Sequence, residues 1–119
     1  MRDPLKDKGR LMHMLDMAVL LDTERPNHSL DMIKSDRVAF FGLSKIVEII
    51  GEAAYKITKE FKESHPELPW KQIEGMRHIL VHGYFSISPE VLWDVIENDI
   101  PTLKPVIEKY IEELRRQLQ

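Results

Sequence analysis

Residues 35–61 read SDRVAFFGLSKIVEIIGEAAYKITKEF, and this segment decides the fold class of the chain. Apolar residues recur along one helical face at steps of three and four: Ala39, Leu43, Ile46, Ile50, Ala54 and Ile57. Further apolar side chains beside this face, those of Phe40, Val47 and Ile49, widen the stripe. A stripe this wide is typical of a helix that is buried on more than one side. The segment is therefore predicted to form the central helix of the fold.

Helix-start signals occur before and after this segment. Asp3-Pro4 and Ser88-Pro89 each place a capping side chain before a proline, which suits the first helical turn. From Pro4 the apolar residues again recur at helical spacing, which predicts one long amphipathic helix to about Thr23. The chain contains no segment with the two-residue period of a strand and no internal repeat. Helices are therefore expected from end to end.

Prolines and a glycine divide the remaining sequence into helices. Residues 63–70 are predicted to be a loop, because Pro66 and Pro69 disfavour a helix immediately before them. Pro69 then suits the start of a third long helix, which Gly83 can end. Pro101 is expected to kink or restart the last helix. The prediction is an all-α fold of the up-down type, a bundle of four to five helices with a kinked C-terminal helix.

Composition limits the class of protein. The 119 residues, 43% hydrophobic and 31% charged, suit one globular domain over positions 1–119. No apolar run approaches the roughly 18 residues needed to cross a bilayer, and the N-terminal residues lack the apolar stretch of a secretory signal. Cysteine is absent, which excludes disulfides and thiolate metal sites. A cytoplasmic protein without a membrane partner is the expectation.

The net charge of −3 argues against a protein that grips long stretches of nucleic acid. Such proteins usually carry a basic surplus that displaces counterions from the phosphates. No DNA partner is therefore expected. An enzyme that contacts one or two phosphates can still be acidic, so any activity on RNA has to depend on a local site.

Four polar side chains in and just after a short apolar run could form such a site: Arg77, His78, His82 and Tyr84. Histidine exchanges protons near neutral pH, and arginine offers a fork of donors that matches phosphate oxygens. This pair of residue types suits cleavage of a phosphodiester by the neighbouring 2′-hydroxyl, with His82 moving a proton and Arg77 neutralising charge. Five residues turn about 140° on a regular helix, so the two share a face only if the helix end distorts at Gly83.

Other interpretations of these residues remain open at this stage. An arginine and a histidine at a helix end are commonly capping residues. His78 and His82, at i and i+4, could instead share a metal, although the sequence offers no fixed third ligand nearby. Glu52 on the central helix either lies on a solvated face or orients Arg77 across the bundle. Spacing alone does not decide between these readings.

The segment Arg-x4-His-x-Tyr resembles the signature of the HepT-like ribonucleases of the HEPN superfamily. The supporting blocks occur in the family's order and spacing: Ile49-Ile-Gly-Glu-Ala-Ala-Tyr55, Leu68-Pro-Trp70, Gly75-Met-Arg77, Val81-His-Gly-Tyr84, and Trp93 with Asn98-Asp-Ile-Pro101. The resemblance covers about residues 6–113. The short arginine–histidine pattern is weakly specific, whereas its combination with these blocks is strongly specific.

This resemblance implies a HEPN-type helical bundle that forms a homodimer with two active sites facing a shared cleft. It implies a metal-independent endoribonuclease without a cofactor, acting as the toxin of a toxin–antitoxin pair. Arg77 and His82 would be the catalytic pair. A small MNT-type nucleotidyltransferase antitoxin would transfer adenylate onto Tyr84. His78 departs from the small polar or acidic residue common after the motif arginine, and could assist as a second proton carrier.

A second class of function fits the same resemblance. In it the chain is a non-catalytic helical subunit of a nucleotidyltransferase complex. It would present Tyr84, or the pocket around Arg77, as substrate or nucleotide site. Cleavage of RNA by the purified chain separates the two classes.

Overall fold

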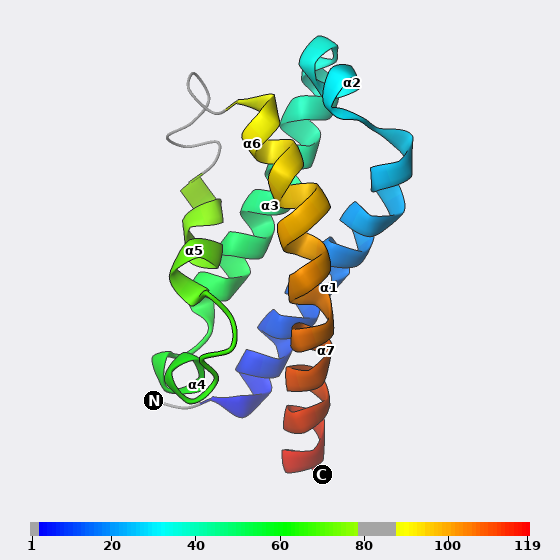
Figure 1. The fold of residues 1–119 in the computed structure, drawn as a ribbon. Helices are drawn as coiled ribbons and strands as arrows, with labels where there is room; N and C mark the ends of the chain where they lie inside the picture. The colour runs from blue at the N-terminus through cyan, green and yellow to red at the C-terminus, as the bar shows by residue number, and fades with distance from the viewer. Residues whose placement is uncertain (1–2, 79–87) are drawn as a thin grey trace.

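The computed structural model describes residues 3–78 and 88–119, and the regular structure within them is entirely helical (Figure 1). The α-helices are α1 (Pro4–Glu24), α2 (Leu30–Ser35), α3 (Arg37–Lys56), α4 (Lys59–Ser64), α5 (Trp70–Gly75), α6 (Pro89–Asp94) and α7 (Ile100–Gln117). Short 3₁₀ turns occupy Arg25–Asn27 and Met76–His78, and a π-helical turn occupies Val95–Asp99. The predicted all-α fold is confirmed.

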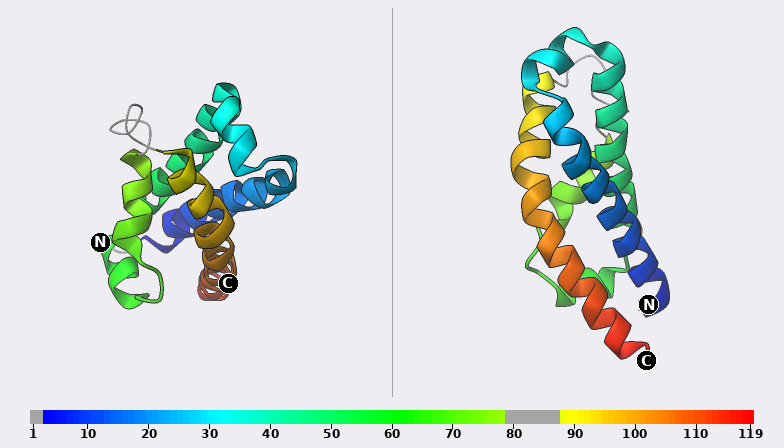
Figure 2. Two further views of the ribbon diagram at one scale, coloured as in Figure 1. Left: turned by 45° about the horizontal axis from the view of Figure 1, so that its top comes forward. Right: turned by 90° about the vertical axis from the view of Figure 1, so that its right-hand side faces the viewer.

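The three long helices form the core of an up-down bundle. α1 packs against both α3 and α7, and the three run along the long axis of a molecule 48 Å by 27 Å by 20 Å (Figure 2). Successive elements alternate in direction, with α1 and α5 running up and α3 and the α6–α7 pair running down in Figure 1. Fully buried side chains from each helix fill the centre: Leu11, Met14 and Leu21 from α1, Val47, Ile50 and Ala54 from α3, and Ile107, Tyr110 and Leu114 from α7. Among the described residues, no helix is both long and apolar enough to cross a membrane.

The two predicted helix starts are confirmed by their caps. The Asp3 carboxylate accepts a hydrogen bond from the Lys6 backbone N–H at 3.2 Å, and the Ser88 hydroxyl accepts one from the Val91 N–H at 3.1 Å. Each cap satisfies one of the N–H groups that a helix leaves without a partner in its first turn. The sequence signal succeeded here because a cap depends only on residues three positions apart.

The predicted central helix over residues 35–61 is wrong at its C-terminal end. α3 stops at Lys56, and Ile57 and Thr58 are extended before α4 begins at Lys59. The cause lies far away in sequence, because the buried Asp7 carboxylate accepts hydrogen bonds from the Thr58 N–H at 2.9 Å and from its hydroxyl at 2.7 Å. The Thr58 hydroxyl in turn accepts the Phe61 N–H and caps α4. This arrangement turns the chain through α4 so that α5 folds back along α3.

The Asp7–Thr58 contact leads to a stability prediction. Asp7→Ala is expected to lower the free energy of unfolding by about 1–3 kcal/mol, because it leaves buried donors of Thr58 without an acceptor. Asp16→Ala is the matched control, since it removes the same charge from an exposed position of α1. Urea unfolding followed by circular dichroism measures both. Equal stability of the two variants would contradict the role given to Asp7.

The C-terminal helix continues through the predicted break with a change of winding. Immediately before Pro101, the π-helical turn Val95–Asp99 places the Ile100 N–H on the Val95 carbonyl. Proline has no N–H to donate, so a wider turn at this point keeps the neighbouring backbone groups paired. Ile96 and Ile100 both remain buried. The expected kink or restart at Pro101 therefore takes the form of a π turn followed by α7.

Candidate functional site

Those candidate residues that the structure describes lie in the turn after α5 and on α3. Arg77 and His78 belong to the 3₁₀ turn Met76–His78, whereas His82 and Tyr84 lie outside the described residues. The regular helix expected from Pro69 to Gly83 therefore changes its winding after Gly75. A 3₁₀ turn advances three residues per turn, so successive residues of Met76–His78 are about 120° apart instead of the roughly 100° of a regular helix.

Gly51 brings the backbone of α3 against the backbone that carries Arg77. A Cβ atom placed on Gly51 would overlap the Arg77 backbone nitrogen and would lie 2.8 Å from the Met76 carbonyl carbon and 2.9 Å from the Ile73 oxygen. Atoms in a helix backbone cannot swing aside as the end of a side chain can. The contact therefore requires glycine at this position, and it fixes the 3₁₀ turn against α3.

The Arg77 guanidinium lies over an aromatic ring of α3. Its Cζ is 3.4 Å from the centroid of the Tyr55 ring, four residues after Gly51. Arginine stacks favourably on the electron-rich face of such a ring. The Arg77 Nε is buried without a hydrogen-bond partner, and within residues 3–78 and 88–119 no carboxylate pairs with this guanidinium. The side chain is thus held in place by packing while its positive charge stays available to an anion.

Lys62 of α4 ties the supporting elements together. Its ammonium donates to the carbonyl oxygens of Ala54 at 3.2 Å and Tyr55 at 3.4 Å, and to the Glu74 carboxylate at 3.0 Å. These carbonyls belong to the last turn of α3, where a positive charge also interacts favourably with the helix dipole. Lys62 thereby links the end of α3 to α5 and restrains the turn that bears the Tyr55 ring.

A shallow depression of about 290 Å³ opens beside Arg77. It is lined by Lys71, Glu74, Gly75, Arg77 and His78. The carboxylate of Glu74 is occupied by Lys62, which leaves Lys71 and Arg77 as the dominant charges of this surface. A small anion, such as one phosphate group, suits such a surface, and His78 is one of its lining residues.

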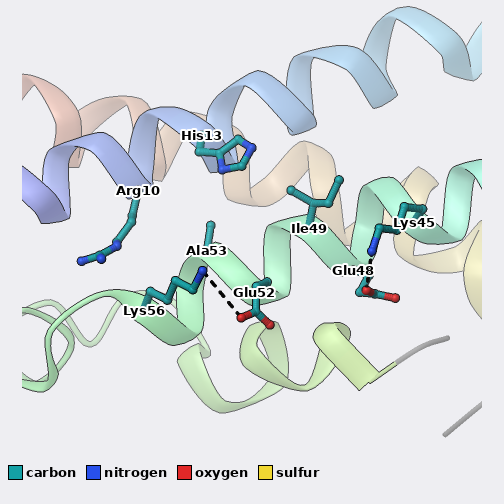
Figure 3. A pocket seen from close by; sticks show the side chains of 8 residues that line it. All are labelled: Arg10, His13, Lys45, Glu48, Ile49, Glu52, Ala53 and Lys56. Carbon is teal, nitrogen blue, oxygen red and sulfur yellow. Dashed lines mark hydrogen bonds and ion pairs between the residues drawn. The ribbon is translucent and has the colours of Figure 1, made fainter. Parts of the chain in front are cut away.

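The structure places Glu52 away from Arg77. Its ion pair is with Lys56 on the same helix, at 3.9 Å, and its side chain is half exposed. Figure 3 shows Glu52 and Lys56 on α3, across a groove from Arg10 of α1. Of the two interpretations of Glu52, the structure therefore agrees with the solvated face, and within residues 3–78 and 88–119 the Tyr55 ring, not Glu52, lies against the Arg77 guanidinium.

The roles of Gly51, Tyr55 and Lys62 are not evident from the sequence alone. The first two occur in the Ile49–Tyr55 block, yet nothing in their spacing to Arg77 indicates contact. Within the described part of the chain, no three His, Asp or Glu side chains gather as a metal site. The alternative of a metal between His78 and His82 depends on His82, outside that part, and stays a hypothesis.

Comparison with known proteins agrees with this architecture. The family model described as Ribonuclease HepT-like matches residues 14–110. A protein of Thermococcus cleftensis named a probable ribonuclease HepT is 43% identical over 74 residues, covering 62% of this chain and 67% of that protein. A protein of Caldanaerobacter subterraneus subsp. tengcongensis, named a candidate RNase, is 33% identical over 102 residues, covering 86% and 91%. No solved structure matches the chain. The matched span contains both α3 and the Arg77 turn, and the chain belongs to the ribonuclease HepT-like family.

Proposed function

We propose that this chain is a metal-independent endoribonuclease that acts as the toxin of a toxin–antitoxin pair. The observation that carries the proposal is the Arg77 guanidinium, which is held against the Tyr55 ring and paired with no carboxylate of the described residues. A structural arginine at a helix end normally satisfies carbonyls or carboxylates. An arginine that is packed in place with its charge uncompensated suits a phosphate that gains negative charge during reaction.

In the proposed reaction the RNA supplies its own nucleophile. His82 accepts the proton of a 2′-hydroxyl, and the 2′ oxygen attacks the adjacent phosphorus. Arg77 binds the oxygens of the five-coordinate phosphate, whose charge it neutralises. The bond between phosphorus and the 5′ oxygen then breaks, and the departing oxygen takes up a proton. His78, which lines the same depression, is the residue proposed to assist that second transfer.

The proposed regulation acts on Tyr84. An MNT-type nucleotidyltransferase antitoxin would transfer adenylate from ATP onto the Tyr84 hydroxyl, with loss of pyrophosphate. The added phosphodiester brings a negative charge and a bulky nucleoside within a few residues of His82. Both would compete with RNA for the positive surface beside Arg77. We also propose a homodimer whose two sites face a shared cleft, as the family resemblance implies.

The first experiment tests the nuclease activity itself. Purified chain is incubated with single-stranded RNA in excess EDTA, and the products are resolved on a denaturing gel. Cleavage is expected to persist in EDTA, because the proposed groups carry the proton and the charge without a metal. Activity that disappears in EDTA and returns with a divalent cation would contradict the mechanism. Absence of cleavage, with stable binding to a nucleotidyltransferase, would favour the non-catalytic subunit.

The second experiment tests the modification. The chain is co-expressed with a family nucleotidyltransferase, and intact mass spectrometry is expected to show the addition of adenylate. The Tyr84→Phe variant is expected to keep its unmodified mass and to remain toxic in the presence of the partner. Tyr55→Phe serves as the matched control, since it removes the hydroxyl of a different, exposed tyrosine, the one whose ring lies against Arg77. Adenylate that maps to any residue other than Tyr84 would refute the regulatory part of the proposal.

A further inference from the structure

A second polar groove lies between α1 and α3, and the proposed mechanism does not use it. Figure 3 shows side chains of both helices around a hollow of about 500 Å³. Its lining consists of basic, acidic and apolar residues: Arg10 and His13 from α1, and Lys45, Glu48, Ile49, Glu52, Ala53 and Lys56 from α3. Arg10 and His13 lie one turn apart on α1 and reach the same hollow.

The charges of the groove are unevenly paired. Both carboxylates are taken by lysines of their own helix, Glu48 by Lys45 at 2.9 Å and Glu52 by Lys56 at 3.9 Å. Arg10 has no hydrogen bond or ion pair within residues 3–78 and 88–119. The groove thus holds more permanent cations than carboxylates, although the whole chain has a net charge of −3. This local excess favours an anionic ligand.

The groove adjoins the surface that carries Arg77. Glu52 and Lys56 line the groove, and Tyr55, whose ring supports Arg77, lies between them on α3. On a regular helix Tyr55 is turned about 60° from Glu52 and about 100° from Lys56. One side of α3 therefore faces the groove while the neighbouring side presents the stacked arginine. A polymer that has one phosphate at Arg77 can continue around α3 into the groove.

We propose that this groove binds the backbone of single-stranded RNA next to the cleaved bond, with Arg10 contacting a phosphate. The inference rests on the proposed ribonuclease function. RNA fits better than an acidic peptide because the lining combines the apolar side chains of Ile49 and Ala53 with the imidazole of His13, a ring on which a base can stack. Sequence-independent contacts of this kind position a strand without selecting its bases. The groove is thus a substrate-binding surface distinct from the catalytic pair.

Salt-dependent binding tests the groove without requiring cleavage. The probe is a fluorescently labelled 2′-O-methyl oligoribonucleotide, which lacks the nucleophile and stays intact. Anisotropy titrations over a range of salt concentrations give the slope of log affinity against log salt. Arg10→Gln is expected to weaken binding several-fold at low salt and to reduce the slope by about 0.7, the value for one phosphate contact on a single strand.

Lys8→Gln is the matched control, since it removes one positive charge from the same helix about 160° around its axis from Arg10. Its slope is expected to equal that of the unaltered chain. Equal slopes for the two variants would contradict the proposal that the groove binds RNA. Failure of the unaltered chain to bind the probe would contradict it as well. A change of molecular mass in solution caused by Arg10→Gln would also overturn it, by identifying the groove as an interface between copies.

The two proposals fail in different ways. If the unaltered chain cuts RNA but Arg10→Gln binds the probe as Lys8→Gln does, the proposed ribonuclease function is supported and the proposed RNA binding in the groove is wrong. If the probe binds with the expected dependence on Arg10 but natural RNA is not cut, the proposed RNA binding in the groove is supported and the proposed ribonuclease activity is wrong.

Discussion

Replacing His82 with alanine is expected to lower the rate of RNA cleavage by about 10²–10⁴-fold, the range in which a positioned proton-transfer group contributes. Single-turnover cleavage of a short RNA in EDTA measures this effect with enzyme in excess. His28→Ala is the control, because that histidine lies between the 3₁₀ turn Arg25–Asn27 and α2 and is bonded to Glu24 at 3.3 Å. An unchanged rate after His82→Ala would end the proposed mechanism.

A second series of variants tests whether Arg77 stabilises the charge that develops on the phosphate. Arg77→Ala is expected to cost about 10²–10³-fold, the loss typical when one donor to a developing anion is removed. Arg77→Lys keeps the charge but loses the planar fork that stacks on Tyr55, so it is expected to recover only part of the rate. Tyr55→Phe retains the ring and is expected to be close to the unaltered chain, whereas Tyr55→Leu is expected to be slower. Equal rates for the two Tyr55 variants would show that the ring does not position Arg77.

Gly51→Ala is expected to damage stability and activity together. The added methyl group would overlap the Arg77 backbone nitrogen, and relief requires α3 and the 3₁₀ turn to move apart. Overpacking of this kind costs about 1–3 kcal/mol in the free energy of unfolding. The same movement displaces the guanidinium, and a misplacement of about 1 Å at a reacting group can cost about 10²-fold in rate.

Gly42 provides the matched control on the same helix. A Cβ atom at Gly42 meets nothing within 4 Å, so Gly42→Ala is expected to raise stability by about 0.5–1 kcal/mol through helix propensity. Urea unfolding and single-turnover cleavage of the two variants separate the effects. A Gly51→Ala protein that is as stable and active as Gly42→Ala would contradict the close approach of the two backbones.

The parts of the fold that depend on nearby residues were predictable from the sequence. The caps at Asp3 and Ser88 and the buried faces of α1 and α7 follow from spacings of three and four residues. The break after Lys56 was not predictable in this way, because the residue that holds Thr58 extended is Asp7, 51 positions earlier. Hydrophobic periodicity continues through Ile57, and it therefore predicted a helix where a distant carboxylate imposes a turn.

In the candidate site, too, the features set by nearby residues were predictable and those set by distant contacts were not. The residue types of Arg77 and His82 indicated phosphodiester chemistry, and the surrounding blocks indicated the family. Their support was not predictable, since a ring under an arginine is set by the packing of α3 on α5. Glu52 was selected for its charge, yet the contact to Arg77 comes from the neighbouring turn of α3, at Tyr55.

The contact between Asp7 and Thr58 also suggests the order in which the helices form during folding. The first turn of α4 gains its anchor only when α1 has docked, which requires a closed loop of about fifty residues. α4 and α5 are too short to be stable alone, so the arginine-bearing turn is expected to form late and to open together with the start of α1. Hydrogen exchange should therefore find the amides of α4 and α5 protected as one cooperative unit with the N-terminal turn of α1.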